Sequence, residues 1–533
     1  MTDLEPAGGT IMNELRQQKY ADSRRRWILF AALVTIPFCV LVAQEPKNGL
    51  ELAKQRHAKM GRGISLANFL EITNPSNRVR ITTDDIVTIK NAGFNTIRVP
   101  VKWEYDRSNV EKLGPYDRGV YPDRFSAIAA PLQKDSSVAG KFLKDCNNYM
   151  GRQSKKPVKP NAKFTRFQQP EEQLACVILR AKGEGIMVIV TNHHNNTIIE
   201  VGKEDSEWSA RKEAFLNQTN LIISALEPWN DTVMFELLNE PNADKWSRTN
   251  MDRESWEIIL SGFSDENRKP TRLTLLIGGT DWNSIRGLDE LNLPMNPNGG
   301  NIILTAHYYD PPCFAQAYEK RRNSRCLNEI KAHRTIRPLE GGKCSLCCQS
   351  VECSNINQTE VESVWWSPHA KFPGSQHPSY IPGKPLEGEV EKKGCDVIRA
   401  DFKRLREIAK EKGYPVFLGE FGTTTTIADS PSRVQWAYHI VRAARVDRTC
   451  QLDMDQVADA GAVSPIPWVY WGYNSEDFGI FRIPEDSQRA NCLTPEGRII
   501  KKKGQNSECS GQDILRALMS ADKMSFAEII DGK

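Results

Sequence analysis

Residues 233–241 read Val-Met-Phe-Glu-Leu-Leu-Asn-Glu-Pro, an apolar run that closes on a carboxylate and a proline. Residues 415–422 read Pro-Val-Phe-Leu-Gly-Glu-Phe-Gly, again with an acid where the apolar run stops. Short apolar runs without alternation are typical of strands buried on both faces, as in a parallel sheet covered by helices. A carboxylate at the end of such a strand is costly unless it has a partner or a chemical task.

Eight runs of this kind occur along the chain, separated by stretches with apolar residues at three- and four-residue spacing. The predicted strands are Ile64–Ala67, Thr96–Pro100, Ile186–Thr191, Val233–Leu238, Leu273–Ile277, Ile302–Ala306, Val416–Gly419 and Trp468–Trp471. Predicted helices include Asp84–Asn91, Glu171–Ala181, Arg211–Leu226, Asp401–Lys412 and Ser432–Ala444. Eight strand-helix units predict an α/β fold of the (β/α)8 TIM-barrel type. An open doubly wound sheet is rejected, because Gly61-Arg-Gly63 precedes the first strand and lacks a third glycine.

Three long stretches interrupt this pattern, at 104–170, 310–395 and 484–533. The second holds seven of the 13 cysteines, namely Cys313, Cys326, Cys344, Cys347, Cys348, Cys353 and Cys395. Insertions that follow barrel strands lie on the face that carries the active site, so 310–395 is expected to form a disulfide-linked wall of the cleft. The third stretch is a C-terminal extension, expected to pack on the barrel or trail from it.

The N-terminal region predicts a membrane anchor. Residues 27–44 are an uncharged, largely apolar run that follows Arg24-Arg25-Arg26. We therefore expect a cytosolic basic tail at 1–26, a signal-anchor helix at 27–44, a linker at 45–60 and a type II orientation with the catalytic domain extracellular or luminal. Secretion after cleavage near Gln44 is the alternative. Twelve cysteines after this run and N-glycosylation sequons at Asn217, Asn230 and Asn357 agree with an oxidising compartment.

Composition excludes several other classes. The chain is 39% hydrophobic and 26% charged, as expected for a folded body. A net charge of only +4 argues against a dedicated nucleic-acid surface. There is no P-loop and no complete dinucleotide fingerprint, and the Cys344-x-x-Cys347 pair lacks a matching second pair of zinc ligands. No cofactor, metal or nucleic acid is expected, and the oligomeric state is left open.

Polar residues gather where the predicted strands end. Glu240, Glu420, His193-His194, His307 and Tyr309 all follow apolar runs, and Arg98 lies within one. In a barrel these strand ends open onto one rim, so the side chains converge. A single Glu or His at a strand end is more often structural, but their coincidence favours catalysis. Two carboxylates are what glycoside cleavage requires.

Several motifs extend this interpretation. Asn-Glu-Pro at 239–241 and Gly-Glu-Phe-Gly at 419–422 are the signature of clan A glycosidases. Together with the segments 63–71, 92–103, 192–194, 307–311 and 468–473, they make the chain resemble glycoside hydrolase family 5, the cellulase family, from about residue 61 to residue 481. The expected catalytic domain therefore spans 61–483. A departure is Ser-Leu-Ala-Asn at 65–68, where many relatives read Asn-Leu-Gly-Asn.

The resemblance implies retention of configuration by double displacement, with Glu420 as nucleophile and Glu240 as acid and then base. It further implies that Arg98 keeps Glu420 ionised, that Tyr309 donates to Glu420, and that Asn239 binds the sugar 2-hydroxyl. The remaining implied contacts to the sugar or to Glu240 come from His193, His194, His307, Trp471, Asn68 and Glu71. Because a glycan beside His194 would block the cleft, the sequon at Asn195 is expected to be unmodified.

Specificity is less constrained than chemistry. The region around Glu71 and residues 471–481 favour an endo-β-1,4-glucanase in polysaccharide catabolism or cell-wall remodelling, while β-1,3-glucan and β-mannan stay open. Candidate sugar-stacking aromatics are Trp103, Trp246, Trp282, Trp365, Trp366, Trp436 and Tyr473. A non-catalytic carbohydrate-binding protein is the alternative from another class, and intact Glu240 and Glu420 argue against it. A structural membrane protein that binds a partner through its Cys-rich insertion is a third.

Overall fold

A computed structural model describes most of the region after residue 47. The chain divides into two units, residues 1–47 and 48–533, and every described residue belongs to the second. The described residues are 48–72, 79, 81–104, 119–152, 169–193, 203–241, 252–264, 266–310, 343–346, 349–352, 389–423, 430–445, 465–473, 480 and 512–521.

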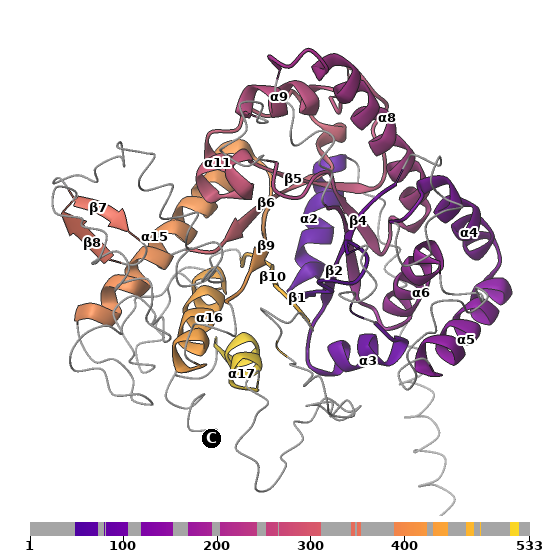
Figure 1. The fold of residues 1–533 in the computed structure, drawn as a ribbon, viewed down its shortest axis with the longest axis horizontal. Helices are drawn as coiled ribbons and strands as arrows, with labels where there is room; N and C mark the ends of the chain where they lie inside the picture. The colour runs from indigo at the N-terminus through magenta and orange to yellow at the C-terminus, as the bar shows by residue number, and fades with distance from the viewer. Residues whose placement is uncertain are drawn as a thin grey trace, which may run out of the picture. The chain divides into compact units, whose positions relative to one another are not determined.

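Eight parallel strands close into a barrel, as predicted (Figure 1). Around the barrel their order is β1, β10, β9, β6, β5, β4, β3, β2, and β1 closes the circle by pairing Arg62 with Trp468 of β10. Each strand overlaps one predicted run. Their bounds are β1 Arg62–Ser65, β2 Thr96–Val101, β3 Met187–Asn192, β4 Val233–Glu236, β5 Thr274–Gly278, β6 Ile302–Tyr308, β9 Val416–Phe421 and β10 Trp468–Tyr470.

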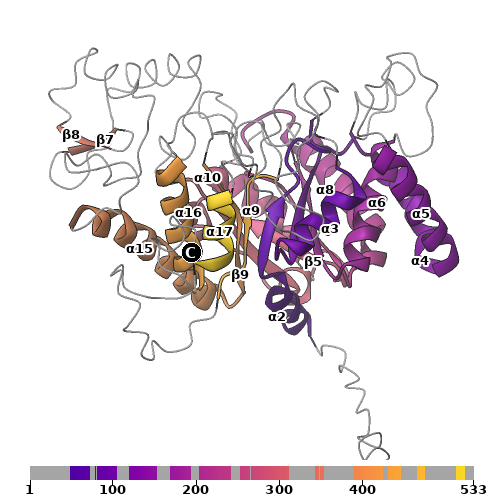
Figure 2. The same ribbon diagram turned by 90° about the horizontal axis from the view of Figure 1, so that it is seen from below.

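Helices surround the strands (Figures 1 and 2). Their buried faces form one continuous apolar layer with the outward-facing residues of the strands. This layer contributes most of the burial that stabilises the fold. The helices are α3 Thr83–Asn91, α4 Pro122–Lys134, α5 Ser136–Arg152, α6 Pro170–Gly183, α8 Trp208–Leu226, α9 Arg253–Ser261, α10 Thr280–Asn283, α11 Ile285–Asp289, α15 Glu389–Lys412, α16 Ser430–Arg445 and α17 Gln512–Ser520, with short 3-10 turns at Glu227–Trp229 and Asn298–Gly300.

Residues expected to form a linker instead close one end of the barrel. Gly49–Met60 form helix α2, capped by the side chain of Asn48. Ala53 and Met60 join a second apolar cluster with inward-facing residues of the strands, including Met234 and Phe417. A linker prediction fails here because the apolar face of α2 is narrow, and its packing partners lie more than 100 residues away.

All three predicted interruptions contain regular structure. The stretch 104–170 includes α4 and α5, and its second helix is joined to α6 by a disulfide between Cys146 and Cys176. The stretch 310–395 includes an antiparallel pair, β7 Lys343–Leu346 and β8 Gln349–Glu352. The side chains of the seven cysteines in that insertion lie outside what the structure describes, so the expected disulfide-linked wall stays a prediction. In the C-terminal extension, α17 packs on α16 and buries Ile514, Ala517 and Leu518.

The Cys146–Cys176 disulfide gives a stability prediction. Its sequence separation is 30 residues, and a cross-link that closes a loop of this length stabilises by about 3–4 kcal/mol in the chain-entropy account. Replacing both cysteines by serine is expected to lower the free energy of unfolding by about that amount, measured by urea denaturation. Each single replacement should cost as much as the pair. An unchanged unfolding midpoint in the double variant would contradict the assignment.

The membrane location predicted from the sequence is corrected by the structure. No helix in the part of the chain described here is long and apolar enough to cross a membrane. Even α15, with 24 residues, is rich in Lys, Arg, Asp and Glu, and so lacks the apolar length that a span requires. The expected anchor at 27–44 lies outside the described residues, as do the basic tail and Gln44.

Candidate active site

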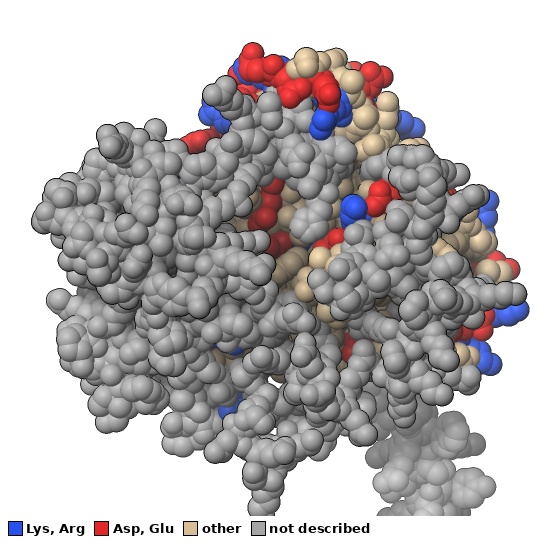
Figure 3. Space-filling model, viewed as in Figure 1, with Lys and Arg blue, Asp and Glu red and all other residues tan. Residues whose placement is uncertain are grey.

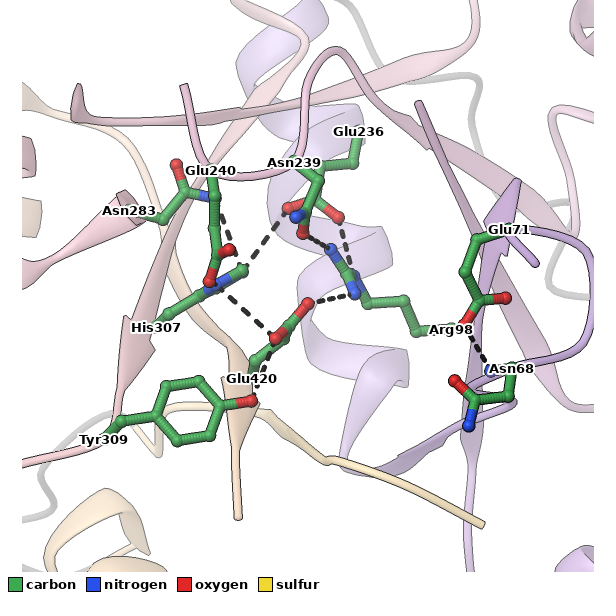
Figure 4. A network of polar contacts seen from close by, with 10 residues as sticks. All are labelled: Asn68, Glu71, Arg98, Glu236, Asn239, Glu240, Asn283, His307, Tyr309 and Glu420. Carbon is green, nitrogen blue, oxygen red and sulfur yellow. Dashed lines mark hydrogen bonds and ion pairs between the residues drawn. The ribbon is translucent and has the colours of Figure 1, made fainter. Parts of the chain in front are cut away.

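The site is organised around a buried arginine on β2. Arg98 donates from Nε to Glu236 Oε2 at 2.7 Å, from Nη1 to Glu420 Oε1 at 2.5 Å, and from Nη2 to Asn239 Oδ1 at 2.7 Å. Arg98 and Glu236 are fully buried, and the side chain of Glu420 is 5% exposed. One guanidinium therefore fixes groups from β4, the turn after β4 and β9 (Figure 4).

A register shift aims Glu420 into the barrel. Ala306 of β6 lies opposite Leu418 of β9, but the next residue, His307, lies opposite Glu420, which leaves Gly419 as the extra residue. Such a bulge turns the following side chain to the other face of the strand. Glycine suits this position because a Cβ on Gly419 would lie 2.4 Å from the hydroxyl oxygen of Thr305.

Glu240 meets His307 across the rim. Glu240 lies just beyond β4 with a left-handed backbone (φ 47°), a conformation that is costly for a non-glycine residue and is concentrated at functional sites. Nδ1 of His307 lies 2.9 Å from Glu240 Oε1 and 3.7 Å from Glu420 Oε2. The contact implied between His307 and Glu240 is thus present. Glu240 is 28% exposed and stands on the open side of the pair.

Aromatic groups complete the rim. Tyr309 donates its hydroxyl to Glu420 Oε2 at 2.9 Å. The ring of Trp471 stacks on His193, with centroids 5.7 Å apart and planes 9° apart, and the guanidinium of Arg98 lies 5.9 Å from the Trp471 centroid. Figure 3 shows acidic side chains at the bottom of a hollow in the middle of the face that is turned toward the viewer.

Asn68 and Glu71 form a separate pair on the loop after β1, apart from the other labelled residues in Figure 4. The carboxylate of Glu71 accepts from the backbone N–H of Asn68 and, at 3.0 Å, from that of Phe69. Asn68 is in the left-handed region (φ 62°) and Glu71 is 3% exposed. Through these hydrogen bonds Glu71 stabilises the loop that carries Asn68.

Charge coupling sets the protonation of the cluster. Burial alone would raise the pKa of Glu236, but Arg98 and then His307 outweigh it and lower that pKa to about 2. Burial would lower the pKa of His307, but Glu420, Glu236 and Glu240 together raise it to about 9. His307 is therefore an imidazolium at neutral pH. The pKa of Tyr309 is raised by burial and by Glu420, so its hydroxyl stays a donor.

The expected effect of Arg98 on Glu420 is only partly realised. The ion pair is present, yet the pKa of Glu420 lies above its usual range. Burial is the largest cause, and the charges of Glu240 and Glu236 add to it against Arg98 and His307. The sequence does not reveal this, because Arg98 shares its single charge between Glu236 and Glu420.

Among the described residues, Glu240, His307 and Glu420 bring ligand atoms within 4.8 Å of one another, the spacing of a metal site. A protonated imidazole has no lone pair to offer a metal. With His307 charged, a metal would have to displace the proton on this nitrogen before it could bind there.

Two residues of this cluster are absent from the sequence-based site, Glu236 and Asn283. Glu236 is the last residue of β4, and an acidic residue in a fully buried strand is the sequence feature that points to it. Asn283 Nδ2 lies 3.4 Å from Nε2 of His307, and no local pattern points to it. Of the candidate aromatics, Trp103 and Trp436 are core residues and Trp282 is 39% exposed. His194, Asn195, Trp246, Trp365 and Trp366 lie outside the described residues.

The His307 pKa predicts a pH-dependent stability. Because the folded-state pKa is raised from 6.5 to about 9, His307 stabilises fully below pH 6.5, and this contribution is lost as the pH rises through 9. The advantage of wild type over His307→Gln in unfolding free energy should shrink by on the order of 3 kcal/mol between pH 6 and 9.5. Denaturation at a series of pH values measures it.

His57 serves as the matched control for this series. Burial lowers the pKa of His57. The contact of its ring with the backbone carbonyl of Val416 opposes this shift but does not cancel it. Its contribution is therefore lost as the pH falls below 6.5, and the difference between wild type and His57→Gln should run in the opposite direction. Two parallel curves would contradict the charge assignment of His307.

The chain is similar to one protein family and to several solved structures. The family profile Cellulase (glycosyl hydrolase family 5) matches residues 155–477, more than half of the chain. Two similar solved structures are Cel5A from Thermotoga maritima with cellobiose (21% identity, 87% of this chain, 98% of that chain, TM-score 0.49) and a lichenase from Caldicellulosiruptor sp. F32 with cellotetraose (17%, 89%, 95%, TM-score 0.48). Similarity at this level identifies no substrate.

A third similar structure is the cellulose synthase subunit Z of Clostridioides difficile (21% identity, 87% of this chain, 100% of that chain, TM-score 0.45). No curated protein sequence matches the chain significantly. The profile match begins after β2, and the structure adds β1 and β2 with Arg98 to the same closed barrel. The chain belongs to glycosyl hydrolase family 5.

Proposed function

We propose that the protein is a retaining β-glucan hydrolase in which Glu420 is the nucleophile and Glu240 the acid and base catalyst. The observation that carries the proposal is the spacing of their carboxylates, which bring oxygens within 4.8 Å of each other. Retaining glycosidases have carboxyl groups about 5–5.5 Å apart, and inverting ones about 6.5–9.5 Å apart. The short spacing is that of the retaining class, in which the second carboxylate attacks the sugar directly, and we assign this attack to Glu420.

In the first step a carboxylate oxygen of Glu420 bonds to the anomeric carbon as the glycosidic C–O bond breaks. Glu240 transfers its proton to the departing oxygen. Arg98 and Tyr309 hold the attacking carboxylate by hydrogen bonds of 2.5 and 2.9 Å, which fixes its direction before the reaction. Asn239, held by Arg98, binds the sugar 2-hydroxyl in this proposal.

In the second step Glu240, now a carboxylate, takes a proton from water as the water oxygen attacks the anomeric carbon. Glu420 leaves as a carboxylate, and the product keeps the original configuration. The exposure of Glu240, 28% against 5% for Glu420, supports this division because water and leaving group arrive from the open side.

β-1,4-Glucan is the substrate class we propose, with endo action. The family description, cellulase, supports it, and the exposed Trp282 in α10, just after β5, offers an aromatic face at the rim. Aromatic faces suit the C–H surfaces of glucose units.

The test uses the full chain and measures reducing ends released from carboxymethyl-cellulose, mixed-linkage β-glucan, laminarin and mannan. We expect cleavage of carboxymethyl-cellulose and mixed-linkage β-glucan, and none by Glu420→Gln. Cleavage of laminarin or mannan alone would replace the substrate class and leave the mechanism standing. A folded protein that binds one of the four and cuts none would instead be a carbohydrate-binding protein.

A further inference from the structure

The ring of His307 has charged or polar groups on both sides. On its Nδ1 side lie Glu240 at 2.9 Å and Glu420 at 3.7 Å. On its Nε2 side lie the amide of Asn283 at 3.4 Å and Glu236 Oε1 at 3.8 Å. The proposed mechanism uses Glu240 and Glu420 and gives no role to Asn283 and Glu236.

Two buried atoms on the Nε2 side lack a hydrogen-bond partner among the described residues, Glu236 Oε1 and Asn283 Oδ1. An unpaired buried acceptor costs about 1–3 kcal/mol, so two of them around one ring nitrogen call for a donor there. Nε2–H of an imidazolium is such a donor. Turning the amide of Asn283 by 180° exchanges its two ends and places Oδ1 against Nε2.

The backbone is built to bring Asn283 to this position. Asp281, Trp282 and Asn283 all adopt left-handed conformations (φ 59°, 57° and 56°), which cost roughly 1–2 kcal/mol for each non-glycine residue. Gly278, the last residue of β5, leaves the space that the amide fills, because a Cβ there would lie 2.0 Å from Asn283 Oδ1. The strained turn at 281–283 and the absence of a side chain at Gly278 thus both favour the contact between Asn283 and His307.

Glu236 is fixed just as firmly. Its Oε2 accepts from Arg98 Nε at 2.7 Å, and this leaves Oε1 pointing toward His307 (Figure 4). The charged groups around the ring are Glu236 and Glu240 from β4 and the turn after it, Glu420 from β9 and Arg98 from β2, and Tyr309 completes the shell. Glu236 faces the nitrogen that lies away from the substrate.

We propose that Glu236 and Asn283 are positioning residues that hold His307 as an imidazolium from its Nε2 side, so that Nδ1–H stays directed at Glu240. The catalytic consequence rests on the proposed function. The charge state of the His307 ring is independent of the proposed function. A fixed cation beside the pair orients Glu240 and offsets the negative charge that develops when Glu240 gives up its proton.

Replacing Glu236 by glutamine tests the proposal with little change of shape. Arg98 can only donate, so the amide oxygen takes over its bond and the NH2 group faces Nε2. An NH2 donor favours the lone pair of a neutral ring. In Glu236→Gln, the titration midpoint of His307 is expected to fall from about 9 by at least about one pH unit.

The midpoint is followed by NMR of the full chain labelled with ¹³C at histidine Cε1, the His307 signal being assigned by its loss in His307→Gln. The double variant Glu236→Gln/Asn283→Asp returns a carboxylate to the Nε2 side and should restore the midpoint. Glu171→Gln changes another buried glutamate, on α6, and should leave the midpoint unchanged. A midpoint in Glu236→Gln within 0.3 pH unit (about 0.4 kcal/mol) of wild type would overturn the proposal.

Activity gives a second readout. The alkaline limb of kcat/KM for glucan should move to lower pH in Glu236→Gln and return in the double variant, while KM changes little. If wild type cleaves no glucan, the proposed function fails, and the NMR midpoints still decide the role of Glu236. If Glu236→Gln does not fold, Asn283→Asp alone is expected to raise the midpoint above wild type, and an unchanged value would contradict the proposal.

Discussion

Glu420→Gln is expected to lower kcat for β-glucan hydrolysis by at least about 10⁴-fold, the largest effect of any single replacement in this site. An amide oxygen is too weak a nucleophile to displace the glycosidic oxygen, so no glycosyl-enzyme forms. The glutamine side chain keeps the shape of the site, since its oxygen still accepts from Arg98 and its NH2 group can donate to the hydroxyl oxygen of Tyr309. Initial rates of reducing-end release measure the loss.

The matched control for this replacement is Glu171→Gln. Glu171 is also buried, but it accepts from the backbone N–H of Tyr121 at the start of α4, away from the catalytic cluster. Its loss should change stability and leave kcat near the wild-type value. If Glu420→Gln retained more than about a hundredth of wild-type activity with an unchanged unfolding curve, Glu420 would not be the nucleophile.

Glu240→Ala is expected to show a loss that depends on the leaving group. For polysaccharide, kcat should fall by about 10²–10⁴-fold, because the departing hydroxyl needs a proton. For 2,4-dinitrophenyl β-cellobioside the first step needs no acid, so a rapid burst of phenolate should precede slow turnover as the glycosyl-enzyme waits for a base. The burst amplitude and the steady-state rate are read in one stopped-flow trace.

Azide separates the acid role of Glu240 from its base role. As an anion it attacks the glycosyl-enzyme without general-base help, so it should restore turnover of the aryl cellobioside by Glu240→Ala and yield a β-glycosyl azide. The same addition should not restore Glu420→Gln, which forms no intermediate. Equal losses for both substrates, with no response to azide, would contradict the assignment of Glu240.

The barrel could be predicted because its strands are continuous apolar runs. Each of the eight predicted runs carries a local signal in four to six residues, and the closed order follows from right-handed strand-helix units. Helix α2 carries no comparable signal. Its residues look like a polar connection, and only Met187, Ile303 and the other inward residues at the barrel end make it part of the core.

The candidate site was predictable where a polar residue lies within or directly after a predicted strand. Arg98, Glu240, His307, Tyr309 and Glu420 do meet in the structure, as the barrel topology requires.

Other features of the site depend on geometry that sequence spacing does not carry. The bulge at Gly419 turns Glu420 inward, and the left-handed turn before Asn283 reaches His307 from β5. The charge of His307 depends on three carboxylates that are brought together by folding.

The most direct test is to trap the intermediate on the full chain with 2,4-dinitrophenyl 2-deoxy-2-fluoro-β-cellobioside, whose fluorine slows the second step more than the first. Peptide mass spectrometry then locates the sugar. We predict a single fluorocellobiosyl ester on Glu420, formed with one equivalent of released phenolate and absent from Glu420→Gln. An adduct on Glu240 or Glu236, or phenolate release by wild type with no ester on any carboxylate, would contradict double displacement through Glu420.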